Sequence, residues 1–433
     1  MTARSTALSA LIACRKQRAW SDGVLKEYIA RDGLDRRDAA LASRLCYGVL
    51  QNQLLIDFYI SRFLKGKLRD LQPVVLDILR LGVYQLTMTD KIPPSAAVNE
   101  AVEQGKKYAN ARAAGLINGM LRAISRAETL PEPPDLATRY SHPEALVELL
   151  RENVGDDLLP ALLESHNRAP RTVVQVNTVR VSAGEAAELL QKQGVGCEKH
   201  PWLPDCYYLT GTGSIENLDA FREGLVYVQD PAAKLAALCS GVQAGMKVLD
   251  CCAAPGGKSF AAAIEMGDAG AIVSCDIHPH KLTLIGKGAE RLGLTIITPQ
   301  LQDACEPVPE WNGTMDVVIA DVPCSGLGVI RKKPDIRYKD LGRIGELPRV
   351  QSAILERQAQ YVRPGGVLLY STCTILRREN EDVVNGFLKA HPEFALEALP
   401  LPEACGLSGP MATFLPCTQD TDGFFIAKMR KTQ

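Results

Sequence analysis

Two cysteines stand directly after apolar runs of the chain. Cys324 ends the sequence DVPC, which follows the run 315–320, and Cys373 ends the sequence STC, which follows the run 367–370. A thiolate is a strong nucleophile that can attack an electron-poor ring carbon and form a covalent intermediate. Two thiols beside the Asp321 carboxylate would suit that chemistry, whereas one cysteine at the end of a strand is usually a small packing residue.

A turn with two glycines lies upstream, after the apolar run 247–251. This turn, Cys252–Lys258, reads CAAPGGK. Gly256 and Gly257 let the chain turn tightly and approach a ligand with its backbone, at the start of a helix. The pattern differs from the GxGxxG fingerprint of dinucleotide-binding domains, because it has only two glycines and a proline. Alone, it indicates either a ligand site or a plain strand–helix connection.

Two further carboxylates stand where later apolar runs end. Asp276 lies 26 positions after Asp250, where a carboxylate in a doubly wound sheet can accept hydrogen bonds from ribose hydroxyls. Its alternative role is to cap a helix that begins near His278. Asp303 could receive the exocyclic amine of an adenine, or it could be a loop carboxylate in water.

The apolar runs that precede these residues predict a buried parallel sheet. Strands are expected at 247–251, 271–275, 315–320 and 367–370, with helical or mixed segments between them and a last, antiparallel strand at 423–428. In such a sheet the turns at the carboxyl ends of neighbouring strands face one crevice. We therefore predict an α/β Rossmann-like domain over 231–433 that brings the thiols, Asp321 and the glycine turn together.

The first 230 residues have a different texture. Helical spacing of apolar residues predicts an all-α domain over 1–130, interrupted at 92–95 by two prolines. A proline-rich linker and a helical segment follow over 131–170, where Ser141–Glu144 has the form of a capping box. A small α+β module, RRM-like in outline, is expected over 171–230, with strands at 172–177 and 206–209 and a helix at 183–193.

Composition places the chain among globular proteins. It has 433 residues, enough for two or three domains, with 46% apolar and 23% charged residues and no apolar stretch of the roughly 18–20 residues that a membrane span requires. Charges at Arg15, Lys16 and Arg18 interrupt the apolar start, so we expect no signal peptide and a cytoplasmic protein. The thirteen cysteines form no CxxC pair, and neither they nor the six histidines show zinc-ligand spacing. We predict reduced thiols and no metal.

The net charge of −1 is unevenly distributed. Residues 1–130 carry 20 Lys and Arg against 12 Asp and Glu, a balance of +8, so the remainder carries −9. A basic domain joined to an acidic one favours contact of the first with a polyanion, although a solvated helical surface would have the same composition.

Three motifs in this order resemble the signature segments of the RNA 5-methylcytosine methyltransferases. They are CAAPGGK, DVPCSG and STC, and the segment Val329–Asp335 is similar to the one that follows the first catalytic cysteine in that family. Val322 departs from the usual alanine. The resemblance implies transfer of a methyl group from S-adenosylmethionine to cytosine C5, with the cofactor held by Cys252, Ala253, Ala254, Pro255, Gly256, Gly257, Lys258, Asp276, Asp303 and Asp321.

This chemistry assigns different tasks to the two thiols. A thiolate that adds to C6 makes C5 nucleophilic, and after methyl transfer a base removes the C5 proton. Spacing does not decide which cysteine attacks. The resemblance implies that Cys373 is the nucleophile and that Cys324 assists release. Asp321 would bind cytosine at N3, and Lys258 would lower the thiolate pKa or orient the base.

The helical domain carries a second resemblance. Val98–Val102 and Gly115–Arg122 are similar to segments of the NusB family of RNA-binding antitermination factors. A NusB-like domain ahead of this catalytic domain is the arrangement of the ribosomal small-subunit methyltransferase B family, which implies a cytosine of 16S rRNA as the target. The alternatives are the same reaction on tRNA, or a non-catalytic RNA-binding assembly factor.

RNA is the expected partner, and we expect a monomer without membrane or metal, although no sequence feature determines the oligomeric state. The small module would help to grip the RNA, whose target base must be unpaired or flipped. Candidate phosphate contacts are Arg15, Lys16, Arg18, Lys65, Lys67, Arg69, Lys106 and Lys107, with Arg331, Lys332 and Lys333 nearer the reacting base.

Overall fold

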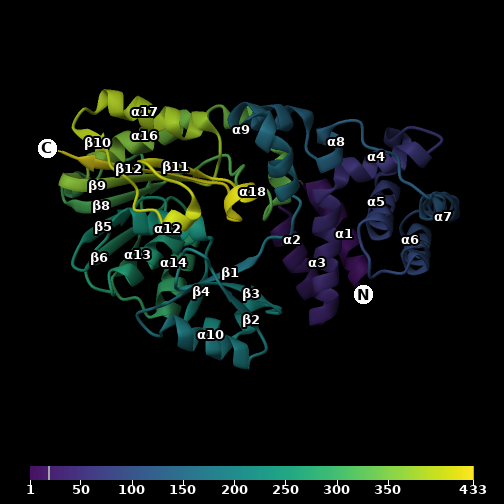
Figure 1. The fold of residues 1–433 in the computed structure, drawn as a ribbon. Helices are drawn as coiled ribbons and strands as arrows, with labels where there is room; N and C mark the ends of the chain where they lie inside the picture. The colour runs from purple at the N-terminus through teal and green to yellow at the C-terminus, as the bar shows by residue number, and fades with distance from the viewer. Residues whose placement is uncertain (18–19, 433) are drawn as a thin grey trace. The chain divides into compact units, whose positions relative to one another are not determined.

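The computed structural model describes residues 1–17 and 20–432 as two compact units (Figure 1). The first, here the helical unit, comprises Met1–Arg168 together with Lys332–Lys339. The second, the catalytic unit, comprises Ala169–Arg331 and Asp340–Gln433. The sequence does not indicate that Lys332–Lys339 belongs with the helices. The domain limits predicted above stay a prediction.

The helical unit confirms the predicted all-α region. Apolar side chains of several helices, among them Leu8, Leu45, Ile56 and Ile78, are fully buried in one core. The proline pair predicted to interrupt the helices does so, because Pro94 begins a new one. The helices are α1 (Ala3–Gln17), α2 (Ser21–Asp32), α3 (Arg36–Gln51), α4 (Gln53–Phe63), α5 (Pro73–Thr87), α6 (Pro94–Tyr108), α7 (Ala111–Arg126), α8 (Leu136–Tyr140) and α9 (Glu144–Ser165), with the 3₁₀ turn η1 (Leu68–Asp70).

The predicted capping box at Ser141–Glu144 is wrong. Ser141 ends α8 in the left-handed conformation, with φ of 58°, and Pro143 is the residue that precedes α9 without a side-chain cap. The Ser141 hydroxyl instead accepts a hydrogen bond from the backbone N–H of Leu54, at 2.8 Å. A tertiary contact therefore takes the hydroxyl that the local pattern assigned to the helix start.

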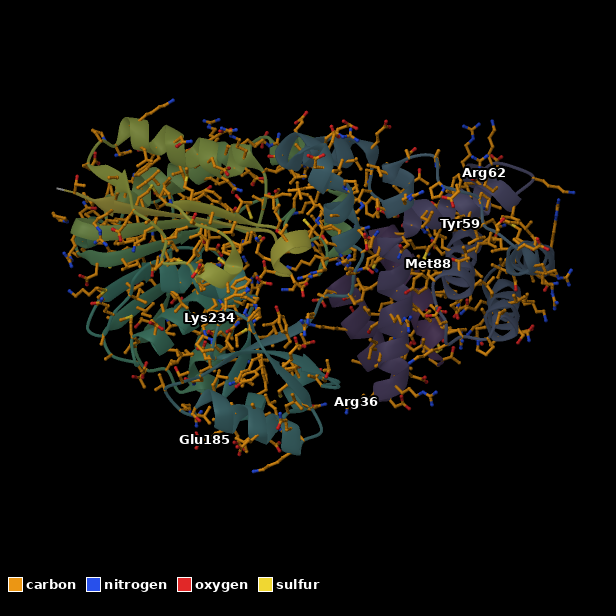
Figure 2. The ribbon with its side chains drawn as sticks, in the orientation of Figure 1. Arg36, Tyr59, Arg62, Met88, Glu185 and Lys234 are labelled. Atoms are coloured by element: carbon orange, nitrogen blue, oxygen red, sulfur yellow. The ribbon has the colours of Figure 1, made fainter. Side chains whose placement is uncertain are left out.

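The catalytic unit begins with the predicted small α+β module. Its antiparallel sheet has the order β2-β3-β1-β4. Ser182 and Glu185 form a reciprocal capping box at the start of its helix, on which Glu185 is labelled in Figure 2. The elements are β1 (Thr172–Val176), α10 (Ala183–Lys192), β2 (Gly196–Lys199), β3 (Cys206–Thr210), η2 (Ile215–Asn217), α11 (Asp219–Arg222) and β4 (Val226–Val228).

The main sheet confirms the predicted α/β fold. Its order is β10-β12-β9-β8-β5-β6-β7, with β11 paired to β12. Strands β5 to β9 are parallel to one another, and β12 is antiparallel to β9 as expected. The strands are β5 (Lys247–Asp250), β6 (Ala271–Asp276), β7 (Ile297–Leu301), β8 (Met315–Asp321), β9 (Val362–Thr372), β10 (Phe394–Leu396), β11 (Met411–Phe414) and β12 (Phe424–Lys431).

Helices cover both faces of this sheet, as Figure 1 shows. Val317 and Ile319 of β8 pack into one core with residues of α12 to α14, whereas Val318 and Ala320 pack into another with α16 and α17. This burial on both faces explains the near-continuous apolar runs. The helices are α12 (Pro231–Cys239), α13 (Gly257–Glu265), α14 (Pro279–Leu292), α15 (Leu341–Ile344), α16 (Leu347–Ala359), α17 (Glu381–Ala390) and α18 (Pro416–Gln419), with 3₁₀ turns η3 (Pro309–Trp311), η5 (Arg377–Glu379) and η6 (Glu403–Cys405).

A buried ion pair joins the small module to the main sheet's helices. Lys234 of α12, labelled in Figure 2, pairs with Asp205 just before β3, and its side chain is only 4% exposed. All thirteen cysteines are free thiols, as predicted. None of the described helices is long and apolar enough to cross a membrane.

Candidate active site

The two cysteines meet where β8 and β9 end. These strands are parallel neighbours, with Asp321 in register with Ser371, so the segments that follow them leave the same edge of the sheet. The Sγ atoms of Cys324 and Cys373 lie 3.2 Å apart, within hydrogen-bond distance for sulfur, and both residues are half-buried. The structure thus brings together the two thiols that the sequence singled out.

The loop that carries Cys324 is fixed by backbone contacts. The N–H of Gly328 donates to the Cys373 carbonyl at 3.0 Å, and the N–H of Gly423 donates to the Gly328 carbonyl at 2.8 Å. A Cβ atom on Gly328 would lie 1.8 Å from the Gly423 carbonyl oxygen, so no larger residue fits without moving backbone. The position of one thiol is therefore tied to the backbone of the other.

Lys258 reaches the same edge from α13. Its Nζ lies 2.6 Å from Oδ2 of Asp321, and its side chain is 10% exposed. The other oxygen of Asp321 accepts a hydrogen bond from the Ser371 hydroxyl at 2.8 Å. Burial lowers the pKa of Lys258, but the Asp321 carboxylate outweighs this effect and the pKa is raised overall. Lys258 is therefore a fixed ammonium beside the thiols.

The surroundings make the two thiols unequal. The pKa of Cys373 is lowered because Cys324 donates a hydrogen bond to its sulfur, and Lys258 also favours the thiolate, against the effects of burial and Asp321. The pKa of Cys324 is raised well above its ordinary value by that same hydrogen bond, by burial and by its negative neighbours, which include Glu379. In this arrangement Cys373 is the thiol that loses its proton more readily, and Cys324 is the thiol that keeps its proton.

Glu379 is a site residue that the sequence analysis missed. It is fully buried, and its Oε2 accepts hydrogen bonds from the backbone N–H of Ser325 and from Nε2 of Gln351, both at 2.9 Å. Among the described atoms, its Oε1 has no hydrogen-bond partner. Because Glu379 lies in the charged run 377–382, its sequence context is that of a solvent-exposed acid, and no local signal marks its burial.

The glycine turn connects β5 to α13 as expected. Gly256 has φ of +113°, and a Cβ there would lie 2.4 Å from the Phe260 ring, so glycine is required. Just before the turn, Asp250 is buried and accepts a hydrogen bond from the Ser259 hydroxyl at 2.7 Å, while its Oδ1 has no partner among the described atoms. Burial raises the pKa of Asp250 to about 7. An orphaned polar atom below a tight backbone turn fits a polar cofactor.

The other two predicted carboxylates end the next strands of the sheet. Asp276 closes β6, where its Oδ1 accepts from the N–H of His278 at 2.9 Å and its Oδ2 lies 3.5 Å from Nζ of Lys281. Asp303 follows β7 and accepts from the N–H of Cys305 at 2.9 Å. The helix-capping role considered for Asp276 is wrong, because the N-cap residue of α14 is His278, whose side chain makes no capping hydrogen bond. The hydrogen bond from His278 instead closes a local turn that leaves the Asp276 carboxylate at the carboxyl edge of the sheet, beside the strand that leads into the glycine turn.

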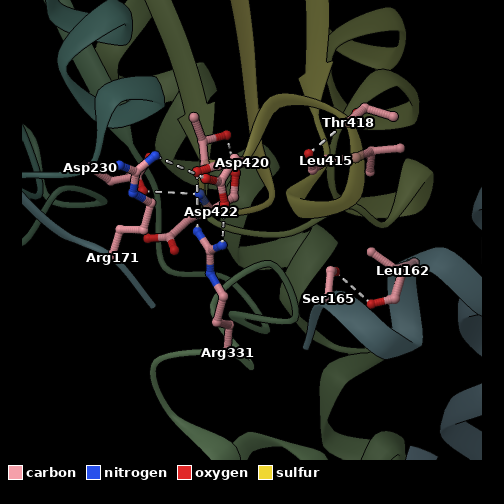
Figure 3. A network of polar contacts seen from close by, with 10 residues as sticks. Leu162, Ser165, Arg171, Asp230, Arg331, Leu415, Thr418, Asp420 and Asp422 are labelled. Carbon is pink, nitrogen blue, oxygen red and sulfur yellow. Dashed lines mark hydrogen bonds and ion pairs between the residues drawn. The ribbon is translucent and has the colours of Figure 1, made fainter. Parts of the chain in front are cut away.

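The predicted contact of Arg331 with RNA is wrong. Arg331 is 5% exposed, and its Nη1 lies 2.8 Å from Oδ1 of Asp420 (Figure 3). The other oxygen of Asp420, Oδ2, lies 3.8 Å from Nη1 of Arg171. Because the Arg331 guanidinium is buried and paired with the Asp420 carboxylate, it is not available to bind an RNA phosphate.

The predicted phosphate contacts of the helical unit fall into three groups. Exposed cations are present at Lys16, Lys65, Lys67, Arg69, Lys106 and Lys107, of which Lys106 pairs with Glu103 and Arg69 lies 4.0 Å from Asp70. Arg15 pairs with Asp77 at 2.9 Å. Arg18 lies outside the described residues.

Comparison with known proteins finds three family models that match successive parts of the chain. A family model described as 16S rRNA methyltransferase RsmB/F matches residues 239–430, the NusB family matches 1–126, and the ferredoxin-like domain of RsmF/B-like methyltransferases matches 142–216. The last two matches confirm the NusB-like domain and the α+β module.

Curated relatives and solved structures are similar to most or all of the chain. The Bacillus subtilis protein named "Probable ribosomal RNA small subunit methyltransferase B" is 36% identical over 442 residues, which cover 99% of this chain and 98% of the relative. "Ribosomal RNA small subunit methyltransferase B" of Salmonella typhi is 33% identical over 400 residues, 91% of each chain. The crystal structure of PH0851 is 26% identical with a TM-score of 0.82 and covers 100% of this chain and 99% of that one. A methyltransferase homolog from Pyrococcus horikoshii is 25% identical with a TM-score of 0.60 and covers 69% and 100%.

The family match and the relatives place the chain among the S-adenosylmethionine-dependent rRNA methyltransferases. The chain belongs to the ribosomal RNA small subunit methyltransferase B family.

Proposed function

We propose that this chain methylates C5 of one cytosine in 16S rRNA through a covalent adduct between Cys373 and cytosine C6. The observation that carries the proposal is the inequality of the two thiols. Cys373 accepts a hydrogen bond from Cys324, 3.2 Å away, and Lys258 favours its negative charge. A cysteine whose pKa is lowered forms its thiolate more readily and depends less on a separate base for attack.

The cofactor-binding part of the proposal rests on the turn and the strand-end acids. S-adenosylmethionine, when bound, supplies an electrophilic methyl group. We propose that Cys252–Lys258 holds it through backbone groups, that Asp276 and Asp303 bind its ribose and adenine, and that Asp321 borders it. The tight turn at Gly256 and the orphaned Oδ1 of Asp250 support this placement.

The base-binding part rests on the ion pair. When the Cys373 sulfur bonds to C6, negative charge develops on the ring at N3. In place of the N3 contact expected for Asp321, the Lys258 ammonium donates a hydrogen bond to N3, and Asp321, fixed by Lys258 and Ser371, accepts one from the exocyclic amine. The ring is then oriented with its C6 toward Cys373.

Release is the task proposed for Cys324. Before attack, its pKa is raised chiefly by the hydrogen bond to Cys373. Once Cys373 has become a neutral thioether, that cause is gone, so the pKa of the half-buried Cys324 falls and its proton can pass to water. The resulting thiolate removes the C5 proton, the electron pair of that C–H bond forms the C5–C6 double bond, and the C6–S bond breaks to regenerate the Cys373 thiolate.

Exposed cations of the helical unit are proposed to position the RNA. Lys65, Lys67 and Arg69 lie together between α4 and α5 and are exposed. Each phosphate contact contributes about −0.7 to the slope of log K against log salt for single strands. Replacing all three by alanine should therefore make the slope shallower by about 2, whereas Lys26→Ala should leave it unchanged. The same proposal divides the chain into four parts. They are an RNA-binding domain over 1–130, a linker and helical segment over 131–170, an RNA-gripping module over 171–230 and a catalytic domain over 231–433.

The test is methyl transfer to purified RNA. With radiolabelled methyl donor and 16S rRNA, we expect labelled 5-methylcytosine after nuclease digestion and one protected cytosine in bisulfite sequencing. Label on another atom of the base or on the ribose would contradict the proposal. Transfer to tRNA in a parallel reaction would support the tRNA alternative, and stoichiometric binding without transfer would support the assembly-factor alternative.

A further inference from the structure

The segment Lys332–Lys339 lies inside the helical unit although the residues on both sides of it belong to the catalytic unit. It contains the 3₁₀ turn η4 (Pro334–Tyr338). The chain therefore passes from one unit to the other at three places, after Arg168, after Arg331 and after Lys339. The passages after Arg331 and after Lys339 exist only because this segment belongs to the helical unit.

Arg337 anchors the segment among the helices. It is 1% exposed and is among the largest fully buried side chains. Its Nη1 donates to the carbonyls of Gln51 at 2.6 Å and Ser141 at 3.1 Å, and its Nη2 donates to the carbonyl of His166 at 3.0 Å and to Oδ1 of Asn167 at 2.6 Å. These acceptors are neutral oxygens rather than carboxylates.

The acceptors belong to three helix ends. Gln51 is the last residue of α3, Ser141 follows α8 and His166 follows α9. The last carbonyls of a helix carry a partial negative charge, which stabilises a cation at that end. Burial lowers the pKa of Arg337 to about 10, so the guanidinium stays charged at neutral pH. Three converging helix ends thus form a guanidinium site in the helical unit. Arg337, from the segment Lys332–Lys339, occupies this site.

A second contact fixes the same segment. The Ser21 hydroxyl, at the start of α2, donates to Oδ2 of Asp335 at 2.5 Å. At the other end of the short connection, Arg331 is held in the catalytic unit by Asp420. Only six positions separate Arg331 from Arg337, and the residues directly before Arg331 form the loop that carries Cys324 and Gly328.

We propose that Arg337 is a positioning residue for the release step, because it fixes the far end of the chain segment that continues from the Cys324 loop. The helical unit thereby holds this loop in place in addition to binding RNA. This inference rests on the proposed function, since it requires Cys324 to act in release. Cys373 lies on a different segment, after β9, and its attack is expected to be less affected.

The test compares Arg337→Ala with Arg343→Ala, an exposed arginine six positions further on. In single-turnover reactions with RNA, we expect Arg337→Ala to accumulate the covalent enzyme–RNA adduct several-fold above wild type on denaturing gels, with unchanged cofactor affinity. Millimolar guanidinium chloride, well below denaturing concentrations, should fill the vacated site and reduce the adduct. Arg337→Lys should resemble Arg337→Ala, because the single nitrogen of lysine cannot replace two nitrogens that donate to four acceptors. Arg343→Ala should behave as wild type.

The outcomes separate this inference from the proposed function. If wild type forms no 5-methylcytosine, the proposed function fails. If wild type methylates and a folded Arg337→Ala releases product at the wild-type rate, the positioning role of Arg337 is wrong. Should Arg337→Ala not fold, Asn167→Ala decides, because it removes one acceptor of the guanidinium from the helical unit alone. A lower melting temperature of Asn167→Ala with unchanged adduct levels would reduce Arg337 to a purely structural residue and overturn the inference.

Discussion

Replacing Glu379 by glutamine tests how the Cys324 loop is held and why its thiol stays protonated. The carboxylate accepts two hydrogen bonds of 2.9 Å, from the Ser325 N–H and the Gln351 amide, in a fully buried place. Glutamine has the same shape, and its single oxygen can accept both bonds. Its amide group would then occupy the position of Oε1, which has no partner in the described structure.

The expected loss of stability follows from these contacts. A hydrogen bond to a charged group contributes about 1.5–3 kcal/mol and a neutral one about 0.5–1.5 kcal/mol, so two bonds lose about 2–3 kcal/mol together. The two unpaired amide hydrogens add to this loss, and the lower cost of burying a neutral side chain offsets part of it. For a unit of this size we expect the melting temperature of Glu379→Gln to fall by roughly 5–10 °C.

The variant should also change the reactivity of Cys324. Glu379 is one of the groups that raise the pKa of this thiol, so its replacement lowers that pKa and increases the thiolate fraction at neutral pH. Calorimetry measures the stability, and isotope-coded alkylation with peptide mass spectrometry measures each cysteine separately. Glu381→Gln is the matched control, since within the described part of the chain that half-buried carboxylate accepts one long hydrogen bond, of 3.4 Å, from Thr413. An unchanged melting temperature together with unchanged alkylation of Cys324 would refute the reasoning.

Three further predictions concern the same edge of the sheet. Lys258→Met removes a cation that favours the Cys373 thiolate, so the pKa of Cys373 should rise and the acid limb of the single-turnover rate should move to higher pH. Asp250 has a pKa of about 7 when folded and an ordinary pKa near 3.9 when unfolded, so its stabilising contribution is complete below about pH 4 and is lost as the pH rises through 7. Asp250→Asn should therefore reduce the change in unfolding free energy between pH 5 and pH 8 by roughly 2–3 kcal/mol in urea titrations, at about 1.4 kcal/mol per pKa unit. Gly328→Ala forces the Gly423 carbonyl away, and a shift of about 1 Å should slow single-turnover methylation by about 100-fold while cofactor binding, measured by calorimetry, stays intact.

The sequence was sufficient to predict the sheet and the meeting of the thiols. Runs such as 315–320 are apolar without alternation because both faces of β8 are covered, and parallel neighbouring strands must end at one edge. Once these strands were recognised, the proximity of Cys324 and Cys373 followed from topology. The unequal pKa values of the two thiols did not follow from topology. They depend on Lys258, which acts on Cys373, and on Glu379, which acts on Cys324.

Other features depend on contacts that local patterns do not encode. Arg337 lies in a polar, proline-containing segment typical of an exposed loop, and it is buried only because three helix ends converge on it. Arg331 appeared to be a phosphate contact because it precedes two lysines, whereas Asp420, 89 positions later, pairs with it. Ser141 fits a local capping box and instead binds the backbone of Leu54. In each case a distant partner determined the role.

The central claim is that Cys373 attacks and Cys324 releases. Its most direct test is to incubate Cys324→Ala with rRNA and S-adenosylmethionine, isolate the adduct that survives denaturation, and identify the nucleotide-linked peptide by mass spectrometry. We predict a methylated cytosine linked to Cys373, and no adduct or methyl transfer from Cys373→Ala, which should still bind the cofactor. A nucleotide linked to a different cysteine, or full turnover by Cys373→Ala, would contradict the claim.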